Sequence, residues 1–204
     1  ADGSFGAPIA SPGSSWGWAL RPHFHDLDGD ARTDIVATIN GAVVAWIANG
    51  DGTFDVLETP VGARYPYDDD VADVDADGAL DLVGVDHSYL EYYVFRGDGT
   101  GGFTLASEGP LPKTPRAVAL GQVWGSRPQM FVAYVGGEIG VADAVGAGMF
   151  TSLSMLGLPY NATDVIVADI NRDTRPDLLF ATTTGVWSWL GTGVVGADIM
   201  CGRS

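Results

Sequence analysis

Lysine and cysteine are almost absent from this sequence, which contains one of each, Lys113 and Cys201. With 10 basic and 26 acidic residues, the formal net charge is −16. A chain this acidic repels nucleic-acid phosphates and anionic membranes, so we expect neither as a partner. One cysteine provides no disulfide framework, and we expect a free thiol. No apolar run approaches the roughly 18 residues that a membrane span needs, so we expect no membrane insertion.

Long helical patterns are also scarce. The chain instead contains 29 glycines and 11 prolines, which is typical of many short strands joined by tight turns. A hydrophobic content of 46% over 204 residues excludes disorder and suits one well-buried domain. The sequence begins at Ala1 rather than Met, which fits a processed, secreted protein and equally a trimmed piece. We expect an extracellular monomer or small homo-oligomer.

The most informative stretch is Asp73-Val-Asp-Ala-Asp-Gly-Ala-Leu-Asp81, which places carboxylates at positions 1, 3, 5 and 9 of a nine-residue loop. Four carboxylates held close together repel strongly, and a hard divalent cation with oxygen ligands removes that cost. Calcium suits the loop best because its shell of about 6–8 oxygens accepts carboxylates and a backbone carbonyl at position 7. Position 12 is Gly84 where an EF-hand needs Glu, so the loop is not an EF-hand.

The same loop occurs twice more, beginning at Asp26, 47 residues earlier, and at Asp169, 96 residues later. We therefore expect about three calcium sites, mainly structural, each holding a tight turn between two strands. In the first loop the predicted ligands are Asp26, Asp28, Asp30, Asp34 and the carbonyl of Arg32. In the second they are Asp73, Asp75, Asp77, Asp81 and the carbonyl of Ala79. In the last they are Asp169, Asn171, Asp173, Asp177 and the carbonyl of Arg175.

The period predicts a further copy midway between the second and last loops, at Gly121. The segment Gly121–Gln129 keeps the Arg-Pro that precedes position 9 in the last copy, but it has lost every acid. We therefore expect a repeat without a metal there. A fixed period of 40–50 residues indicates a supersecondary unit that must stack on its neighbours to bury its faces.

Each unit is predicted to contain four strands: one entering the loop, one leaving it, a third after a hairpin, and a fourth that starts at a Phe after a Gly-rich turn. Runs such as 34–39 are apolar on both faces, which indicates strands covered on both sides. We therefore predict an all-β fold, a β-propeller of four four-stranded blades. The predicted blades are residues 12–60, 61–109, 110–157 and 158–193, in one domain of residues 1–196 with a tail of 197–204.

The predicted ring closes through the N-terminal segment. Phe54, Phe103 and Phe150 each follow a Gly-rich turn, and Phe5 continues that series. The last unit breaks off without such a strand. We therefore expect residues 1–11 to complete the last blade.

The order of apolar strand, Asp-x-Asp-x-Asp-x-x-x-Asp, apolar strand, hairpin and Gly-Asp-Gly-x-Phe resembles the FG-GAP (also called VCBS) repeats. Such repeats form the propellers of integrin α-subunits, of mushroom and bacterial propeller lectins, and of some secreted polysaccharide-active enzymes. The resemblance covers nearly the whole chain. Propellers of this family usually have more blades than the four counted here, so the chain forms either a compact ring or part of a larger one.

Aromatic residues near the loops and unit entrances are candidates for sugar stacking, with Asp and Asn nearby to accept hydroxyl groups. These candidate ligand-binding residues are Trp16, Trp18, Tyr65, Tyr67, Tyr89, Trp124 and Tyr160. By contrast, Trp46, Tyr93 and Trp189 are predicted to share one third-strand position and to lie in the core. His23 and His25 lie on one face of the first innermost strand, where packing or tunnel lining is expected and a second metal is the alternative.

Two functional classes remain open, with a third behind them. The first is a non-enzymatic recognition module that binds carbohydrate, as the resemblance to propeller lectins implies. The second is a structural or protein-interaction domain of the adhesion type. The third is a polysaccharide-active enzyme, which is disfavoured because the sequence contains no convergent acid/base or nucleophile set.

Overall fold

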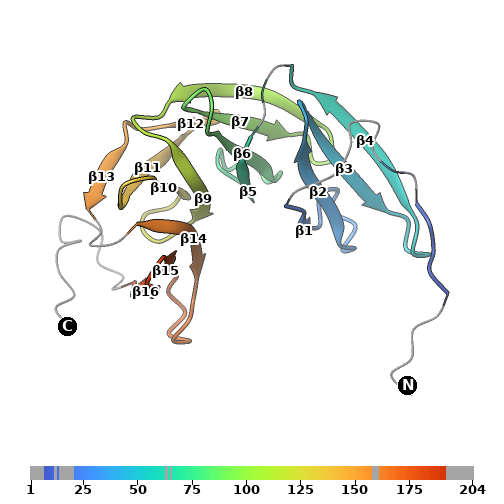
Figure 1. The fold of residues 1–204 in the computed structure, drawn as a ribbon. Coiled ribbons are helices and arrows are strands. Elements are labelled where there is room, and N and C mark those ends of the chain that lie inside the picture. Colours follow the sequence, from blue (N-terminus) through green and yellow to red (C-terminus); the bar gives the residue numbers. More distant parts are fainter. Residues whose placement is uncertain are drawn as a thin grey trace.

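The computed structural model describes residues 7–11, 13, 21–62, 64, 66–157 and 161–191 of the chain. These residues form 16 strands in four antiparallel sheets and no helix. The described part of the chain thus contains no helix long and apolar enough to cross a membrane. The sheets follow one another along an arc, with β1, β5, β9 and β14 on its inner side and β4 and β8 on its outer side (Figure 1).

The first and second sheets have four strands each, paired in chain order. The first consists of β1 (His23–His25), β2 (Asp34–Ile39), β3 (Ala42–Ala48) and β4 (Phe54–Pro60). The second consists of β5 (Asp68–Ala72), β6 (Asp81–Asp86), β7 (Glu91–Gly97) and β8 (Phe103–Pro110). The outer strands β4 and β8 begin at Phe54 and Phe103, as the Gly-rich turns before them predict.

The third sheet has a divided outer strand. It consists of β9 (Pro115–Gly121), β10 (Gln129–Tyr134), β11 (Glu138–Gly146), β12 (Met149–Phe150) and β13 (Ser154–Gly157), and both β12 and β13 pair with β11. The fourth sheet contains three described strands, β14 (Ala162–Ala168), β15 (Asp177–Thr182) and β16 (Gly185–Trp189). All four sheets therefore repeat the predicted order of innermost, second and third strand.

The second strands are buried because successive residues face different neighbouring sheets. Leu82 of β6 belongs to one core cluster with Val36 of the first sheet, and the next residue, Val83, belongs to another with Val132 of the third. These side chains are no more than 1% exposed. Burying one such side chain contributes about 1.5–3 kcal/mol, so the apolar runs at the second strands hold the stack together. This explains the two-sided apolar pattern of residues 34–39.

The expected closure of the last blade by the N-terminal segment is not supported by the described residues. Phe54 N–H donates to Ser11 Oγ at 3.1 Å, and Ile9 Cδ1 lies 2.8 Å from the place where a Cβ on Gly52 would stand. Residues 7–11 thus lie beside β4 of the first sheet, at the opposite end of the arc from β14–β16 (Figure 1). Gly52 leaves the space that Ile9 occupies. Phe5, on which the prediction was based, lies outside the described residues, as does the predicted tail.

The predicted equivalence of three third-strand aromatics is wrong for one of them. Trp46 pairs with Ile35, and Trp189 pairs with Leu178. Ile35 and Leu178 each come one residue after the buried aspartate that ends the acid loop. In the second sheet that place belongs to Phe95, which pairs with Leu82. Tyr93 lies two residues earlier on the same face and is 2% exposed. Tyr93 is a core residue, as expected, but it lies two residues before the position that Trp46 and Trp189 occupy in their strands.

Candidate functional site

The three acid loops join the innermost to the second strand of the first, second and fourth sheets, and they fold in the same way. The aspartate at position 1 accepts backbone N–H groups from positions 4, 5 and 6. In the first loop Gly29, Asp30 and Ala31 donate to Asp26 at 2.8–3.1 Å. In the second loop Ala76, Asp77 and Gly78 donate to Asp73 at 2.7–3.2 Å. In the last loop Asp173 and Thr174 donate to Asp169 at 3.2 and 2.9 Å.

This wrapping requires left-handed backbone at positions 4 and 6. Glycine occupies one of these positions in the first loop and one in the second, but the other places are taken by Ala31, Ala76, Arg172 and Thr174, with φ of 62–70°. Such residues cost about 1–3 kcal/mol each and persist only where surrounding interactions impose them. The same strained backbone therefore recurs at equivalent positions of all three loops.

The aspartate at position 9 joins three parts of each unit. Asp34, Asp81 and Asp177 are 0% exposed. One oxygen accepts the N–H of position 2, and the other accepts an N–H at the end of the third strand. The donors are Leu27 and Ala48 for Asp34, Val74 and Gly97 for Asp81, and Ile170 and Gly191 for Asp177, at 2.7–3.0 Å. Burial raises the pKa of Asp81 to about 6, against the effect of these donors.

The third unit has a neutral residue at position 9, and its side chain bonds within the loop segment rather than to the third strand. Gln129 takes position 9 there and is 2% exposed. Its Oε1 accepts the N–H groups of Val123 and Trp124 at 2.9 and 3.1 Å, and its Nε2 donates to the carbonyls of Trp124 and Arg127. A neutral amide thus replaces the carboxylate where the other acids are missing.

Carboxylates converge on one point in two loops. Within the described residues, oxygens of Asp26, Asp28 and Asp34 lie within 4.8 Å of one another, and so do those of Asp73, Asp75 and Asp81. Three hard, anionic oxygen donors in a strained turn fit calcium better than zinc or copper, which prefer nitrogen and sulfur ligands. The donor set therefore agrees with the predicted cation.

The position 5 carboxylates lie outside these two groups, and each forms an ion pair. Asp30 contacts Arg32, and Asp77 Oδ2 lies 2.7 Å from Arg96 Nη2. The Ala79 amide, followed by Arg96, lowers the pKa of Asp77. The N–H groups of the position 7 residues, Arg32, Ala79 and Arg175, donate to the position 5 carboxylates at 2.8–2.9 Å.

The last loop carries one charge fewer. Asn171 stands at position 3, and its Nδ2 donates to Asp173 Oδ2 at 3.1 Å. Its three aspartates are not among the converging groups of the described residues. The N–H groups of positions 2, 5, 6 and 7 are nevertheless bonded as in the other two loops, and positions 4 and 6 have positive φ in all three.

A second acidic cluster, on the innermost strands, was missed by the sequence analysis. Asp68 and Asp70 of β5 accept the N–H groups of Val118 and Leu120 of β9, at 2.9 and 2.7 Å. Asp69 points the other way and pairs with His23 Nε2 at 2.6 Å. The three aspartates therefore join the second sheet to both its neighbours.

Several pKa values in this cluster are raised. Burial raises the pKa of Asp68 to about 6, although the Val118 amide and Arg21 oppose the shift. Burial also raises the pKa of Asp70. Burial lowers the pKa of His23, but the hydrogen bond to Asp69 and the nearby negative charges outweigh it and leave the pKa raised. Burial and the neighbouring His23 lower the pKa of His25. His23 thus forms an ion pair with Asp69 that joins the first and second sheets.

Replacing Asp68 by asparagine is expected to flatten the pH dependence of stability. The pKa of this carboxyl rises on folding. Its stabilising contribution is therefore full at a pH below its pKa in the unfolded chain, and it is lost as the pH rises through its pKa in the folded protein. A rise from 3.8 to about 6 corresponds to about 3 kcal/mol. In EDTA, Asp68→Asn should match the wild type near pH 4 and exceed it by about 2–3 kcal/mol at pH 7, measured by urea unfolding. Equal stabilities at both pH values would contradict this interpretation.

The candidate aromatics divide into three groups. Trp16, Trp18, Tyr65 and Tyr160 lie outside the described residues. Trp124 does not form an exposed platform, because its indole N–H donates to Asp143 at 2.8 Å and its ring packs edge-on against Phe131 at 5.8 Å. Tyr67 and Tyr89 are 49% and 58% exposed.

Tyr67 and Tyr89 lie at the end of the second sheet that is opposite its acid loop. Tyr67 immediately precedes β5 and donates its N–H to Val85, and Tyr89 lies in the hairpin between β6 and β7. His87 of the same hairpin contacts the Tyr67 ring, with centroids 5.6 Å apart. We refer to Tyr67, His87 and Tyr89 as the aromatic edge. Exposed rings of this kind are suited to stack on the apolar face of a sugar.

No protein-family model matches the chain, and no curated protein matches it. Solved structures do match. BBS1N in complex with ARL6DN, soaked with mercury, superposes with a TM-score of 0.62 at 13% identity, covering 86% of this chain and 52% of that one. An Agrocybe aegerita lectin that recognises non-reducing terminal N-acetylglucosamine superposes with a TM-score of 0.58 at 20% identity, covering 85% of this chain and 49% of that one.

These similarities concern the fold alone, because identities this low carry no site across. They agree with an all-β, propeller-like arrangement of the four sheets. The chain spans about half the length of the solved chains that it matches.

Proposed function

We propose that this protein is a secreted, calcium-binding β-propeller protein of the FG-GAP type that acts as a non-enzymatic recognition module and binds carbohydrate. The observation that supports the calcium assignment is the convergence of three carboxylates in each of two identically folded loops. Extracellular modules bind calcium with Kd of about 10⁻⁴–10⁻³ M, which suits shallow, exposed loops like these. In this proposal calcium is structural and stiffens the turn between two strands.

The carbohydrate assignment rests on the aromatic edge. The exposed Tyr67 ring contacts the His87 ring, and the exposed Tyr89 lies in the same hairpin as His87. The buried Asp86 shapes this hairpin by accepting the N–H groups of Ser88 and Tyr89. Such a group offers ring faces for stacking and polar atoms for sugar hydroxyls. The structural similarity to a lectin is consistent with this role.

Screening the protein on a glycan array, with calcium and with EDTA, tests this function. Saturable binding to particular glycans is the expected result. Tyr67→Ala and Tyr89→Ala should each weaken it by about tenfold, which corresponds to a loss of about 1.4 kcal/mol for each ring removed. Phe24→Ala serves as a control, because Phe24 is 60% exposed but belongs to another sheet. Silence across glycans would contradict the carbohydrate assignment.

A second candidate function is protein interaction, and one observation favours it. The outer face of the fourth sheet exposes Ile166, Val186 and Leu190 by 52%, 72% and 53%, on the side opposite the core residues Val165 and Phe180. Exposed apolar surface on a sheet face suits a protein partner. Retention of glycan binding in a Val186→Asp variant would assign recognition to the aromatic edge rather than to this face.

A further inference from the structure

The second acid loop differs from the other two at one third-strand residue. In the three units with an acid loop, an N–H at or just after the end of the third strand bonds the position 9 aspartate, so the residues just before these amides are structurally equivalent. The amides belong to Ala48, Gly97 and Gly191. The preceding residues are Ile47, Arg96 and Leu190. Only the second of these three loops therefore has a charged residue at this place.

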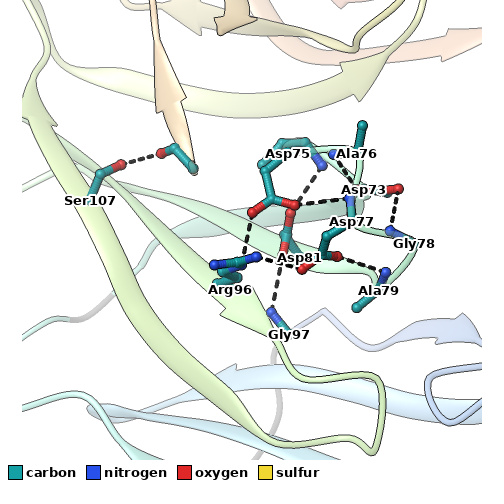
Figure 2. A network of polar contacts seen from close by, with 12 residues as sticks. Asp73, Asp75, Ala76, Asp77, Gly78, Ala79, Asp81, Arg96, Gly97 and Ser107 are labelled. Carbon is teal, nitrogen blue, oxygen red and sulfur yellow. Dashed lines mark hydrogen bonds and ion pairs between the residues drawn. The ribbon is translucent and has the colours of Figure 1, made fainter. Parts of the chain in front are cut away.

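Arg96 reaches into the second loop and contacts two of its carboxylates. Its Nε lies 2.8 Å from Asp75 Oδ2 and its Nη2 lies 2.7 Å from Asp77 Oδ2 (Figure 2). The Asp75 side chain is 4% exposed, whereas the Arg96 side chain is 45% exposed, so the guanidinium covers a buried carboxylate from the solvent side. In the first loop, by contrast, Arg32 contacts Asp30 from within the loop, and Ile47 supplies no charge.

A second arginine reaches the same loop from the neighbouring unit. Arg127, at position 7 of the segment that lacks acids, donates through Nη1 to the backbone carbonyl of Asp75 at 2.8 Å. The second loop is thus flanked by two guanidinium groups. Their positive charge stabilises the clustered carboxylates and opposes a divalent cation at the same place.

We propose that Arg96 is an internal counter-ion of the second acid loop, which competes with calcium and sets a lower affinity there than at the first loop. This inference rests on the proposed calcium binding. Calcium needs the oxygens of Asp75 that the guanidinium holds, so the ion pair must open or be shared before the cation is bound. The first loop fills at lower calcium, and the second fills later.

A site-resolved titration tests this order. Calcium chloride is added to ¹⁵N-labelled protein, and the backbone amides of Ala31 and Gly78 report the first and second loops separately. In the wild type the Gly78 signal is expected to respond at roughly tenfold higher calcium than the Ala31 signal. Arg96→Leu, which copies Leu190 of the last unit, should move the Gly78 midpoint about tenfold lower and leave that of Ala31 unchanged.

Arg96→Lys is the matched control, because lysine keeps the charge but cannot bridge two carboxylates with a planar fork. Arg96→Lys should give a Gly78 midpoint between those of the wild type and Arg96→Leu. Unchanged or weaker calcium binding at Gly78 in Arg96→Leu, with normal binding at Ala31, would overturn the role of Arg96 while leaving the proposed function intact. Absence of a response at both amides, in the wild type and the variant, would overturn both.

Discussion

Replacing Asp34 by alanine is expected to lower the free energy of unfolding of the metal-free protein by about 2–6 kcal/mol. The carboxylate is 0% exposed and accepts the N–H groups of Leu27 and Ala48, both at 2.8 Å. Alanine leaves these donors without a partner, and each unsatisfied buried donor costs about 1–3 kcal/mol. Urea unfolding in EDTA at constant pH measures the change.

Asp28→Ala is the matched control within the same loop. Asp28 belongs to the same converging group of carboxylates, but it accepts a longer backbone hydrogen bond, from Asp30 N–H at 3.2 Å. We expect it to cost less than about 1 kcal/mol without metal, while both variants lose calcium binding at the first loop. Equal losses of stability in EDTA would show that position 9 has no special joining role.

Calcium at 10 mM is expected to stabilise the wild type by about 3–5 kcal/mol. A site with Kd of about 10⁻⁴–10⁻³ M contributes roughly 1.4–2.7 kcal/mol at that concentration, and two loops have converging carboxylates. For a domain of this size the melting temperature should rise by about 6–20 °C. Differential scanning calorimetry in EDTA and in calcium measures the shift.

Magnesium at the same concentration is the control for this prediction. Magnesium demands a tighter octahedron and gives up its water reluctantly, so its effect should be clearly smaller. Sodium chloride at matched ionic strength controls for general screening of the −16 net charge. If all three salts raise the melting temperature equally, the loops have no specific affinity for calcium.

Much of the strand pattern could be predicted from the sequence. A strand is predicted to leave each acid loop, with the run 34–39 as the example, and these strands are β2, β6 and β15. These segments combine apolar runs with turn residues at both ends, so local preference and burial agree.

The joining role of position 9 was not predicted, because the acids of the loop were all interpreted as cation ligands. One signal was present in the sequence. Gln129 is a hydrogen-bonding residue retained at position 9 of a segment that has lost its acids, and the structure shows it bonded to four backbone groups. A polar residue that remains when the ligands disappear indicates a structural bond.

Other features depend on contacts between distant segments and have no local signature. Asp68 and Asp70 bond to amides 50 residues later, and nothing in the Asp-Asp-Asp run identifies these partners. The placement of Ile9 against Gly52 is likewise a tertiary contact, whereas the predicted closure relied on the repeated Phe alone. Trp124 was expected at an exposed loop, but the partner of its indole, Asp143, comes from another strand.

The most direct test of calcium binding by the acid loops is a crystal structure determined in 10 mM calcium chloride, with anomalous scattering data to identify the ion. We predict an ion bound by oxygens of Asp26, Asp28 and Asp34 at about 2.3–2.6 Å, and a second one between Asp73, Asp75 and Asp81. Carboxylates that bind only water under these conditions, with no anomalous signal at either loop, would contradict the account.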